Sequence, residues 1–346
     1  MKNEQKPKRT PLIIIIPFRA AVAMGDGGDG GFDAIVASRR DDAGEAMRAS
    51  RDLPPGTLLV RVAPFAAVPY PDEMRRSCHG CFRACGAERE CGACGVARLC
   101  ASCAGCETTK AYHAYECHAL ARLRDGERGL TLAHNDLRLL LRVLSVRRRH
   151  RDVVASSYAT AASDAAAASG DVIVDDVDAF DALMSGVDGG DDGELPESSI
   201  AMLHEVAKQA KFLVAAEARA SVDACVRTLG RLQLNGFEMT ASASEEEEEE
   251  GGRGGGGGCG GGGHRPIGVG VYPSAAMFNH DCAPNAAQRF DAFGCVRVET
   301  TRRVRKGEEL TIPYVDVMLG REERRGKLRK NFAFECACAR CEREAG

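Results

Sequence analysis

The sequence predicts a β-rich α+β fold, in which several small sheets of short strands are combined with a cysteine-rich module, a helical insert and a cysteine-bearing tail. Short apolar runs that begin after Gly or Pro indicate the strands, and a leucine pattern with helical spacing in the middle of the chain indicates helices. Eight of the 16 cysteines lie between Cys78 and Cys106, which indicates a module held together by metal or by disulfides.

Composition limits the kinds of protein that this chain can be. Of its 346 residues, 44% are hydrophobic and only 5% aromatic, so the core is expected to consist mainly of Leu, Val and Ala. The formal net charge of −4 argues against the strongly basic surface of a sequence-specific nucleic-acid binder. A membrane-spanning helix requires an apolar run of about 18 residues. The sequence contains no such run, so we expect no membrane association.

The expected strands lie in two parts of the chain, before the cysteine-rich module and after the helical insert. Residues 1–31 are expected to form a disordered tail; a targeting segment, or a true start at Met24, are the alternatives. Residues 241–264 contain six consecutive Glu and a Gly run and are expected to form a disordered loop. The expected strands are residues 32–38, 57–62, 237–240, 267–272, 296–300 and 310–313.

Helices are expected in the insert and near the C-terminus. Leu137, Leu140, Leu141 and Leu144 share one helical face. We expect the basic cluster at residues 147–151 to end that helix, because cations are favourable at a helix C-terminus. The other expected helices are residues 198–220, 221–232 and 320–331.

Four closely spaced pairs of metal-binding residues stand in the cysteine-rich module. A structural zinc ion takes four Cys or His ligands, and one tight turn can supply two of them, so eight ligands predict two zinc sites. A closing His-x3-Cys pair has no use in a disulfide framework, which favours zinc over disulfides. The pairs are Cys78 with Cys81, Cys91 with Cys94, Cys100 with Cys103, and His113 with Cys117.

Cysteines outside these pairs bear on two questions: which cysteine completes one site of the module, and whether the chain has a third metal site. Cys85 and Cys106 lie close to these pairs, and Cys106 is the rival of Cys103. Near the C-terminus, a Cys-x-Cys-x2-Cys motif supplies three ligands and needs a fourth, which we expect from the nearby Asn-His-x-Cys motif. The expected third zinc site consists of Cys282, Cys336, Cys338 and Cys341.

Three motifs in the second half of the chain follow the cysteine-rich module in a fixed order. They are Asn-His-x-Cys-x-Pro-Asn at residues 279–285, Glu-Leu-Thr-Ile-x-Tyr at residues 309–314, and the Cys-x-Cys-x2-Cys tail at residues 336–341. In this order they closely resemble the SET domain of the SET-and-MYND (SMYD) protein lysine methyltransferases, which carry a MYND zinc finger near the start of the domain. The resemblance covers residues 32–341 loosely and 231–341 closely.

The resemblance implies a ligand pairing for the finger and a division of the chain. In the family, the first and third pairs of the finger share one ion, and the second and fourth pairs share the other. The implied parts are a tail (1–31), the first SET segment (32–77), the MYND-type finger (78–117), a helical insert (118–230), the second SET segment (231–316) with its loop (241–264), and a post-SET tail (317–346).

The resemblance also implies methyl transfer from S-adenosylmethionine to a lysine side chain of a histone or another protein, in the nucleus and/or the cytoplasm. It implies Tyr314, at the end of the second motif, as the catalytic residue. It implies Phe237 and Phe332 as walls of the channel for the substrate lysine. The residues implied to contact the methyl donor are Gly44, Asn235, Asn279, His280, Tyr314 and Phe334.

Two positions depart from the family pattern. Where the family has Gly-x-Gly against the donor, this chain has Gly44-Glu45-Ala46, and alanine would be strained if that backbone needs a positive φ. The alternative function is therefore a catalytically weak or inactive adaptor whose finger binds proline-containing peptides. Phe332 stands where the family often has Tyr, which bears on the number of methyl groups added.

Overall fold

The structure of the protein, a computed structural model, describes six stretches of the chain. The expected tail at residues 1–31 lies outside them, and so do residues 243–263 of the expected loop at 241–264. The described residues are 34–40, 44–155, 172–188, 193–242, 264–291 and 294–345.

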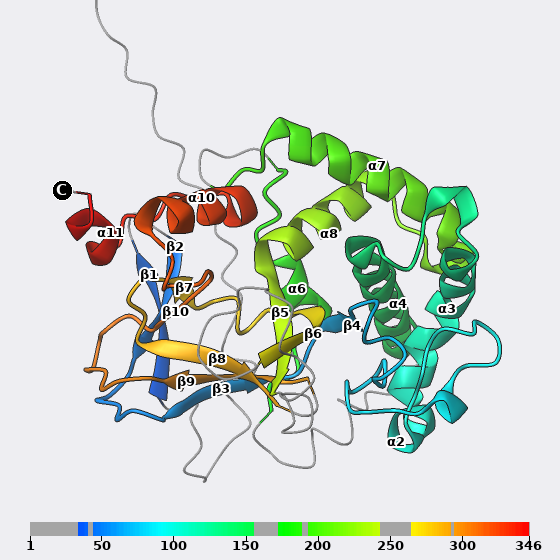
Figure 1. Ribbon diagram of the computed structural model, residues 1–346, viewed down its shortest axis with the longest axis horizontal. Coiled ribbons are helices and arrows are strands. Elements are labelled where there is room, and N and C mark those ends of the chain that lie inside the picture. Colours follow the sequence, from blue (N-terminus) through cyan, green and yellow to red (C-terminus); the bar gives the residue numbers. More distant parts are fainter. Residues whose placement is uncertain are drawn as a thin grey trace, which may run out of the picture.

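Short strands form four small sheets within the described residues, as the sequence predicted (Figure 1). The strands are β1 (Ile35–Arg40), β2 (Gly44–Ala49), β3 (Leu58–Val62), β4 (Ala66–Pro69), β5 (Gly236–Ser242), β6 (His264–Val271), β7 (Asn279–His280), β8 (Ala286–Phe290), β9 (Val296–Thr300) and β10 (Thr311–Ile312). β1 pairs with β2, β9 lies between β3 and β8, and β6 lies between β4 and β5, all antiparallel. β7 and β10 form a short parallel pair.

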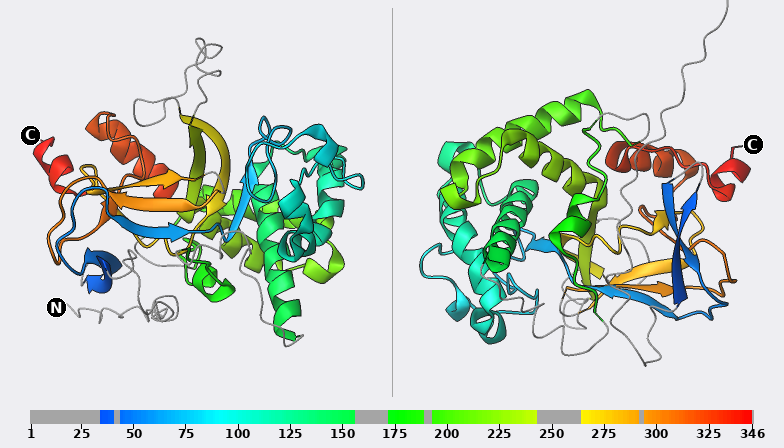
Figure 2. Two further views of the ribbon diagram at one scale, coloured as in Figure 1. Left: turned by 90° about the horizontal axis from the view of Figure 1, so that it is seen from below. Right: turned by 180° about the vertical axis from the view of Figure 1, so that it is seen from behind.

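Most helices gather on one side of the molecule, whereas the last two lie beside the small sheets (Figures 1 and 2). The helices are α2 (Ala101–Gly105), α3 (Glu107–Arg124), α4 (Asn135–Ala155), α6 (Val177–Asp181), α7 (Glu197–Leu213), α8 (Val222–Asn235), α10 (Arg321–Phe332) and α11 (Ala339–Arg343), with 3-10 turns η2 (Ala87–Arg89), η3 (Glu127–Gly129) and η4 (Ala216–Ala218). α4, α6, α7 and most of α8 lie in the segment expected as the helical insert (118–230), and α3 runs on past residue 117, the expected end of the finger.

Two apolar cores match this division into a helical side and a sheet side. The four leucines of the predicted helical face are buried in the first core, together with residues of α3, α7 and α8. The second core fills the space among the small sheets and includes Phe278 and Leu310. Val271 at the end of β6 belongs to the first core and the next residue, Tyr272, to the second, because successive side chains of an extended chain point to opposite faces. The end of β6 therefore links the two halves.

Two predicted helix ends are wrong. α4 continues through the basic cluster at residues 147–151 to Ala155, and Arg147 forms a hydrogen-bonded ion pair with Asp181 at 2.8 Å. The cluster therefore lies along the helix instead of ending it. The helix predicted at residues 198–220 ends at Leu213, and the chain turns before Ser221, whose side chain caps α8.

Candidate metal centres and candidate active site

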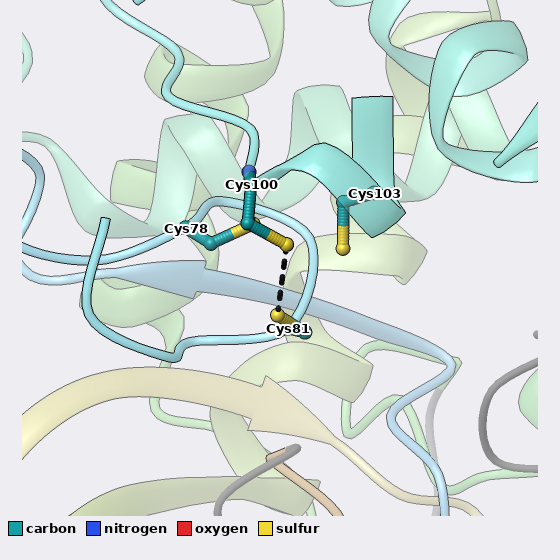
Figure 3. A group of neighbouring side chains, drawn as sticks. All are labelled: Cys78, Cys81, Cys100 and Cys103. Carbon is teal, nitrogen blue, oxygen red and sulfur yellow. Dashed lines mark hydrogen bonds between the residues drawn. The ribbon is translucent and has the colours of Figure 1, made fainter. Parts of the chain in front are cut away.

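The first predicted metal site brings four thiols together (Figure 3). Cys78 and Cys81 lie in the loop before α2, while Cys100 precedes α2 and Cys103 belongs to it. The Sγ atoms of Cys81 and Cys100 are 3.7 Å apart. The group contains Cys103, and Cys106 stands outside it at the start of α3, so the geometry favours Cys103 over its rival.

The second group joins Cys91 and Cys94 to His113 and Cys117. α3 supplies His113 and Cys117 one turn apart, so both side chains project from one face of the helix. The Sγ atoms of Cys91 and Cys117 are 3.9 Å apart. Both ring nitrogens of His113 are buried, and neither makes a hydrogen bond to a described residue. Nδ1 faces the carboxylate of Glu116 at 3.6 Å. A buried polar atom without a hydrogen bond is costly, and a metal ion bound to the other ring nitrogen would satisfy that nitrogen.

The third group forms beside the small sheets, far along the chain from the finger. It joins Cys282, which follows β7, to Cys336, Cys338 and Cys341 around the start of α11. The Sγ atom of Cys282 lies 3.5 Å from that of Cys341 and 3.9 Å from that of Cys336. Arg324 on α10 is fully buried, and its guanidinium lies 3.9 Å from the Cys341 sulfur. This cation compensates the negative charge that thiolates bring to the site.

All three groups fit zinc. Within each group the four ligand atoms lie within 4.8 Å of one another, and tetrahedral zinc with a zinc–sulfur distance of about 2.3 Å places its sulfur ligands about 3.8 Å apart. Disulfide sulfurs would be about 2.05 Å apart, and the described cysteines are free thiols. The protein can therefore hold three zinc ions, each in a structural site with four protein ligands and no open coordination position.

The Asn-His motif forms β7, which lies beside the end of the Glu-Leu-Thr-Ile motif. Asn279 is the register partner of Thr311 on β10, and its side-chain amide donates a 3.0 Å hydrogen bond to Glu309. The backbone N–H of Leu310 donates to the carbonyl of Met47 at 2.8 Å. β2, which begins at the predicted donor-binding glycine, therefore runs beside the same part of the site.

Tyr314 follows β10, and two hydrogen bonds to the segment that contains β7 hold it in place. Its hydroxyl donates a 2.7 Å hydrogen bond to the carbonyl of Phe278, and its backbone N–H donates to Nδ1 of His280 at 3.1 Å. Burial raises the pKa of Tyr314, so the phenol is neutral near pH 7. A neutral hydroxyl can orient a polar group by hydrogen bonding, but it is a poor base.

Three rings stand around Tyr314. The centroid of the Phe332 ring is 4.9 Å from that of Tyr314, that of His280 is 5.4 Å away, and that of Phe334 is 6.3 Å away in an edge-to-face arrangement. α10 ends at Phe332, and Ala333 has a left-handed φ of 57°. This turn at the helix C-terminus redirects the chain, so both flanking phenylalanines reach Tyr314.

Two other predicted site residues lie where α8 passes into β5, which belongs to a different sheet from β7 and β10. Asn235 is the last residue of α8, and its amide donates to the carbonyl of Met184 at 3.1 Å and to a carbonyl of its own helix at 2.9 Å. Phe237 on β5 packs edge-to-face on Tyr272, with ring centroids 5.5 Å apart, and against the same apolar core as Tyr314. The assigned roles of Asn235 and Phe237 stay predictions.

Gly44, Glu45 and Ala46, which depart from the family's Gly-x-Gly pattern, lie in the regular strand β2, which pairs with β1. Ala46 is buried and is not among the described non-glycine residues with a positive φ. The backbone at this position therefore does not require glycine, and the expected strain is absent from it.

Three further residues of the site were not assigned a role from the sequence. Tyr272 is fully buried and donates a 2.7 Å hydrogen bond to the carbonyl of Gly294. Glu309 begins the Glu-Leu-Thr-Ile-x-Tyr motif and Tyr272 ends an expected strand, so the sequence carried a signal for both. Arg324 stands in a highly charged helix, and nothing in its sequence surroundings distinguishes it from neighbouring arginines.

Comparisons with known proteins match the chain to a family and to several relatives. Residues 44–315 match the SET domain family. The chain is 43% identical to the histone-lysine N-methyltransferase SMYD3 of Mus musculus over 76 residues, which cover 22% of this chain and 18% of that protein. It is 25% identical to the histone-lysine N-methyltransferase ASHR1 of Arabidopsis thaliana over 307 residues, covering 86% of this chain and 53% of the relative. A crystal structure of the SET domain of LSMT bound to lysine and AdoHcy aligns with a TM-score of 0.36 and 13% identity, covering 88% of this chain and 53% of that chain.

The small sheets, the paired zinc groups of the finger and the tail group define a SET-type domain with an inserted zinc finger. The chain belongs to the SET domain family, and it is similar to the SET-and-MYND members that its motifs predicted. The alignments span between about a fifth and about half of the curated relatives' own length. In the part of the chain that the structure describes, no helix combines the length and apolarity needed to cross a membrane.

Proposed function

We propose that this chain is a protein-lysine N-methyltransferase that transfers a methyl group from S-adenosylmethionine to a lysine side chain of a histone or another protein. The observation that carries the proposal is the hydroxyl of the partly buried Tyr314, which is hydrogen-bonded to the carbonyl just before the Asn279-His280 strand and stands among aromatic rings. S-adenosylmethionine, when bound, supplies a methyl group activated by the positive charge of its sulfonium.

The residues beside Tyr314 are suited to hold this donor. Aromatic faces attract cations, and the rings of Phe334 and Tyr314 offer two such surfaces at an angle of 87°. The backbone of Asn279 and His280 is held by pairing with β10, so that part of the site is ordered before a ligand arrives. The regular strand at Ala46 removes the backbone strain that favoured an inactive adaptor.

The aromatic rings also suit the other reactant, a lysine side chain. Apolar surroundings disfavour the charged ammonium, and the neutral amine is the nucleophile in this reaction. We assign the walls of the lysine channel to Phe332 and Phe237. Methyl transfer is a direct displacement, so the main task of the protein is to position the two reactants. Because burial keeps the phenol neutral, Tyr314 orients the amine and does not remove its proton.

Calorimetric titration with S-adenosylmethionine and mass spectrometry of a lysine peptide array test the proposal on the zinc-loaded protein. The wild type is expected to bind the donor and to methylate peptides. Tyr314→Phe is expected to retain donor binding and to lose roughly 100-fold or more in turnover, because one oriented hydrogen-bonding group is removed. Tyr70→Phe is the matched control, since its hydroxyl bonds to the exposed Glu238 on the finger side, and it should leave turnover unchanged.

An adaptor would give a different result in the same experiment. It would bind no donor, or its residual methylation would not depend on the hydroxyl of Tyr314. Either outcome contradicts the proposed methyl transfer.

A further inference from the structure

Both ring nitrogens of His280 are engaged, and their partners belong to different parts of the site. Nδ1 accepts a hydrogen bond from the backbone N–H of Tyr314 at 3.1 Å, and Nε2 lies 3.3 Å from the sulfur of Cys282. A backbone amide can only donate, so Nδ1 carries the lone pair and the proton of the neutral ring is on Nε2. The imidazole therefore donates a hydrogen bond to the sulfur of a metal-binding cysteine.

Charged groups also surround the third metal group, where Arg324 pairs with the carboxylate of Glu344 at 2.5 Å. The buried guanidinium of Arg324 already faces the thiols, 3.9 Å from the Cys341 sulfur. An imidazole N–H that points at a thiolate forms a charge-assisted hydrogen bond. The carboxylate of Asp281, next in the chain, accepts the backbone N–H of Ala283 at 2.7 Å and is engaged there.

One short segment thus holds Tyr314 at two points. The carbonyl of Phe278 accepts the hydrogen bond of the Tyr314 hydroxyl at 2.7 Å, and the ring of His280 accepts that of its backbone N–H. Two residues later, Cys282 anchors the same segment in the third metal group. The placement of the phenol therefore depends on a segment whose far end is a metal ligand.

We infer that the imidazole of His280 is a positioning residue that couples the third metal centre to Tyr314, by donating to the Cys282 sulfur and accepting from the Tyr314 backbone. The catalytic consequence of this coupling rests on the proposed methyl transfer, whereas the coupling itself does not. Through these two hydrogen bonds, an ordered metal centre holds the ring in place, and the ring in turn holds the backbone of Tyr314.

Two substitutions of His280 test the coupling in the zinc-loaded chain. His280→Phe keeps an aromatic ring but removes both nitrogens, and His280→Gln keeps one acceptor and one donor on a flexible side chain. In His280→Phe, one of the three zinc ions is expected to pass to a chelator roughly 10- to 100-fold more readily, as for other lost outer-shell partners of a metal. Hydrogen exchange at the Tyr314 amide, followed by mass spectrometry, is expected to accelerate. His280→Gln should give intermediate values, and His134→Phe, at an exposed histidine just before α4, should change neither.

The possible failures can be told apart. Unchanged zinc retention and unchanged exchange in His280→Phe overturn the coupling; if that variant does not fold, the same result in His280→Gln overturns it. These two measurements do not require an active enzyme, so an inactive wild type overturns only the proposed function. With an active wild type, His280→Phe should lower kcat with little change in the KM for S-adenosylmethionine, and His280→Gln should restore part of kcat. A loss confined to KM would contradict the positioning role.

Discussion

The guanidinium of Arg142 and the carboxylate of Glu116 form a two-pronged ion pair between α4 and α3, with N–O distances of 2.7 and 2.9 Å, and both side chains are buried. Arg142 also donates to the backbone carbonyls of Ala67 on β4 and of His79 in the finger, at 3.0 and 3.2 Å. Although burial opposes the charged carboxylate, the attraction of Arg142 lowers the pKa of Glu116 to about 2. Glu116 in turn faces His113, 3.6 Å away. One ion pair therefore joins the second metal group, the helical insert and the sheet.

Removing one partner of this pair is expected to be costly. Arg142→Met or Glu116→Gln should lower the free energy of unfolding by about 3–5 kcal/mol, because the remaining group stays buried without its charge partner. Lys208→Met on α7 is the control: its partner Glu205 and Lys208 itself are mostly exposed, so the change should stay below about 1 kcal/mol. Urea unfolding of the zinc-loaded protein measures both effects, and equal losses at the two sites would refute the structural role of the buried pair.

The first metal group makes a prediction about two neighbouring cysteines. Cys103→Ser removes one of four converging thiols, so the zinc content should fall from three ions per chain to two. Cys106→Ser changes a thiol outside the group and should leave three ions bound. Native mass spectrometry counts the ions directly. A loss of zinc in Cys106→Ser together with full retention in Cys103→Ser would reverse the ligand assignment.

The parts of this molecule that the sequence predicted share a local signal. Four closely spaced pairs, a three-cysteine motif and the cysteine of the Asn-His-x-Cys motif identified twelve residues that the structure gathers into three groups, because close spacing along the chain limits where neighbouring ligands can point. The leucines of α4 repeat with the helical period, so the burial of that face could also be predicted.

The parts that the sequence did not predict depend on contacts between distant residues. β2 has the sequence GEAMRA, which lacks a run of β-branched residues, and it is a strand because β1 and the backbone near Leu310 pair with it. The engagement of both nitrogens of His280 likewise needs Tyr314, 34 residues along the chain, to arrive at one side. Local propensity carries no information about either partner.

Ala46 allows a direct test of the departure from the family's glycine pattern. Because Ala46 lies in a regular strand without a positive φ, Ala46→Gly should lower stability by about 0.5–1 kcal/mol through the extra freedom of the unfolded chain. It should not strengthen the binding of S-adenosylmethionine. Ala49→Gly, at another buried position of β2, is the matched control. A tenfold gain in donor affinity for Ala46→Gly alone would show that the missing glycine limits donor binding.

The ring of Phe332 makes a prediction about how many methyl groups are added. Its centroid lies 4.9 Å from that of Tyr314, so Phe332→Tyr would place a second hydroxyl close to the target amine. That hydroxyl occupies space needed by a methylated amine and can hold the unmethylated amine by a hydrogen bond. Addition of a second methyl group should therefore slow by roughly 10-fold or more, an effect typical of one added group in a tight pocket, while the first addition is less affected.

Time-resolved mass spectrometry of one peptide substrate separates these steps, because mono-, di- and trimethylated products differ by the mass of a methylene group. Phe290→Tyr serves as the matched control, since that ring on β8 packs on Tyr272, 5.9 Å between centroids, and is not among the rings described around Tyr314. The expected result is accumulation of the monomethylated peptide in Phe332→Tyr and a product distribution like that of the wild type in Phe290→Tyr. If Phe332→Tyr leaves the distribution unchanged while the wild type adds more than one methyl group, the Phe332 ring does not border the amine, and the lysine must enter from another side of Tyr314.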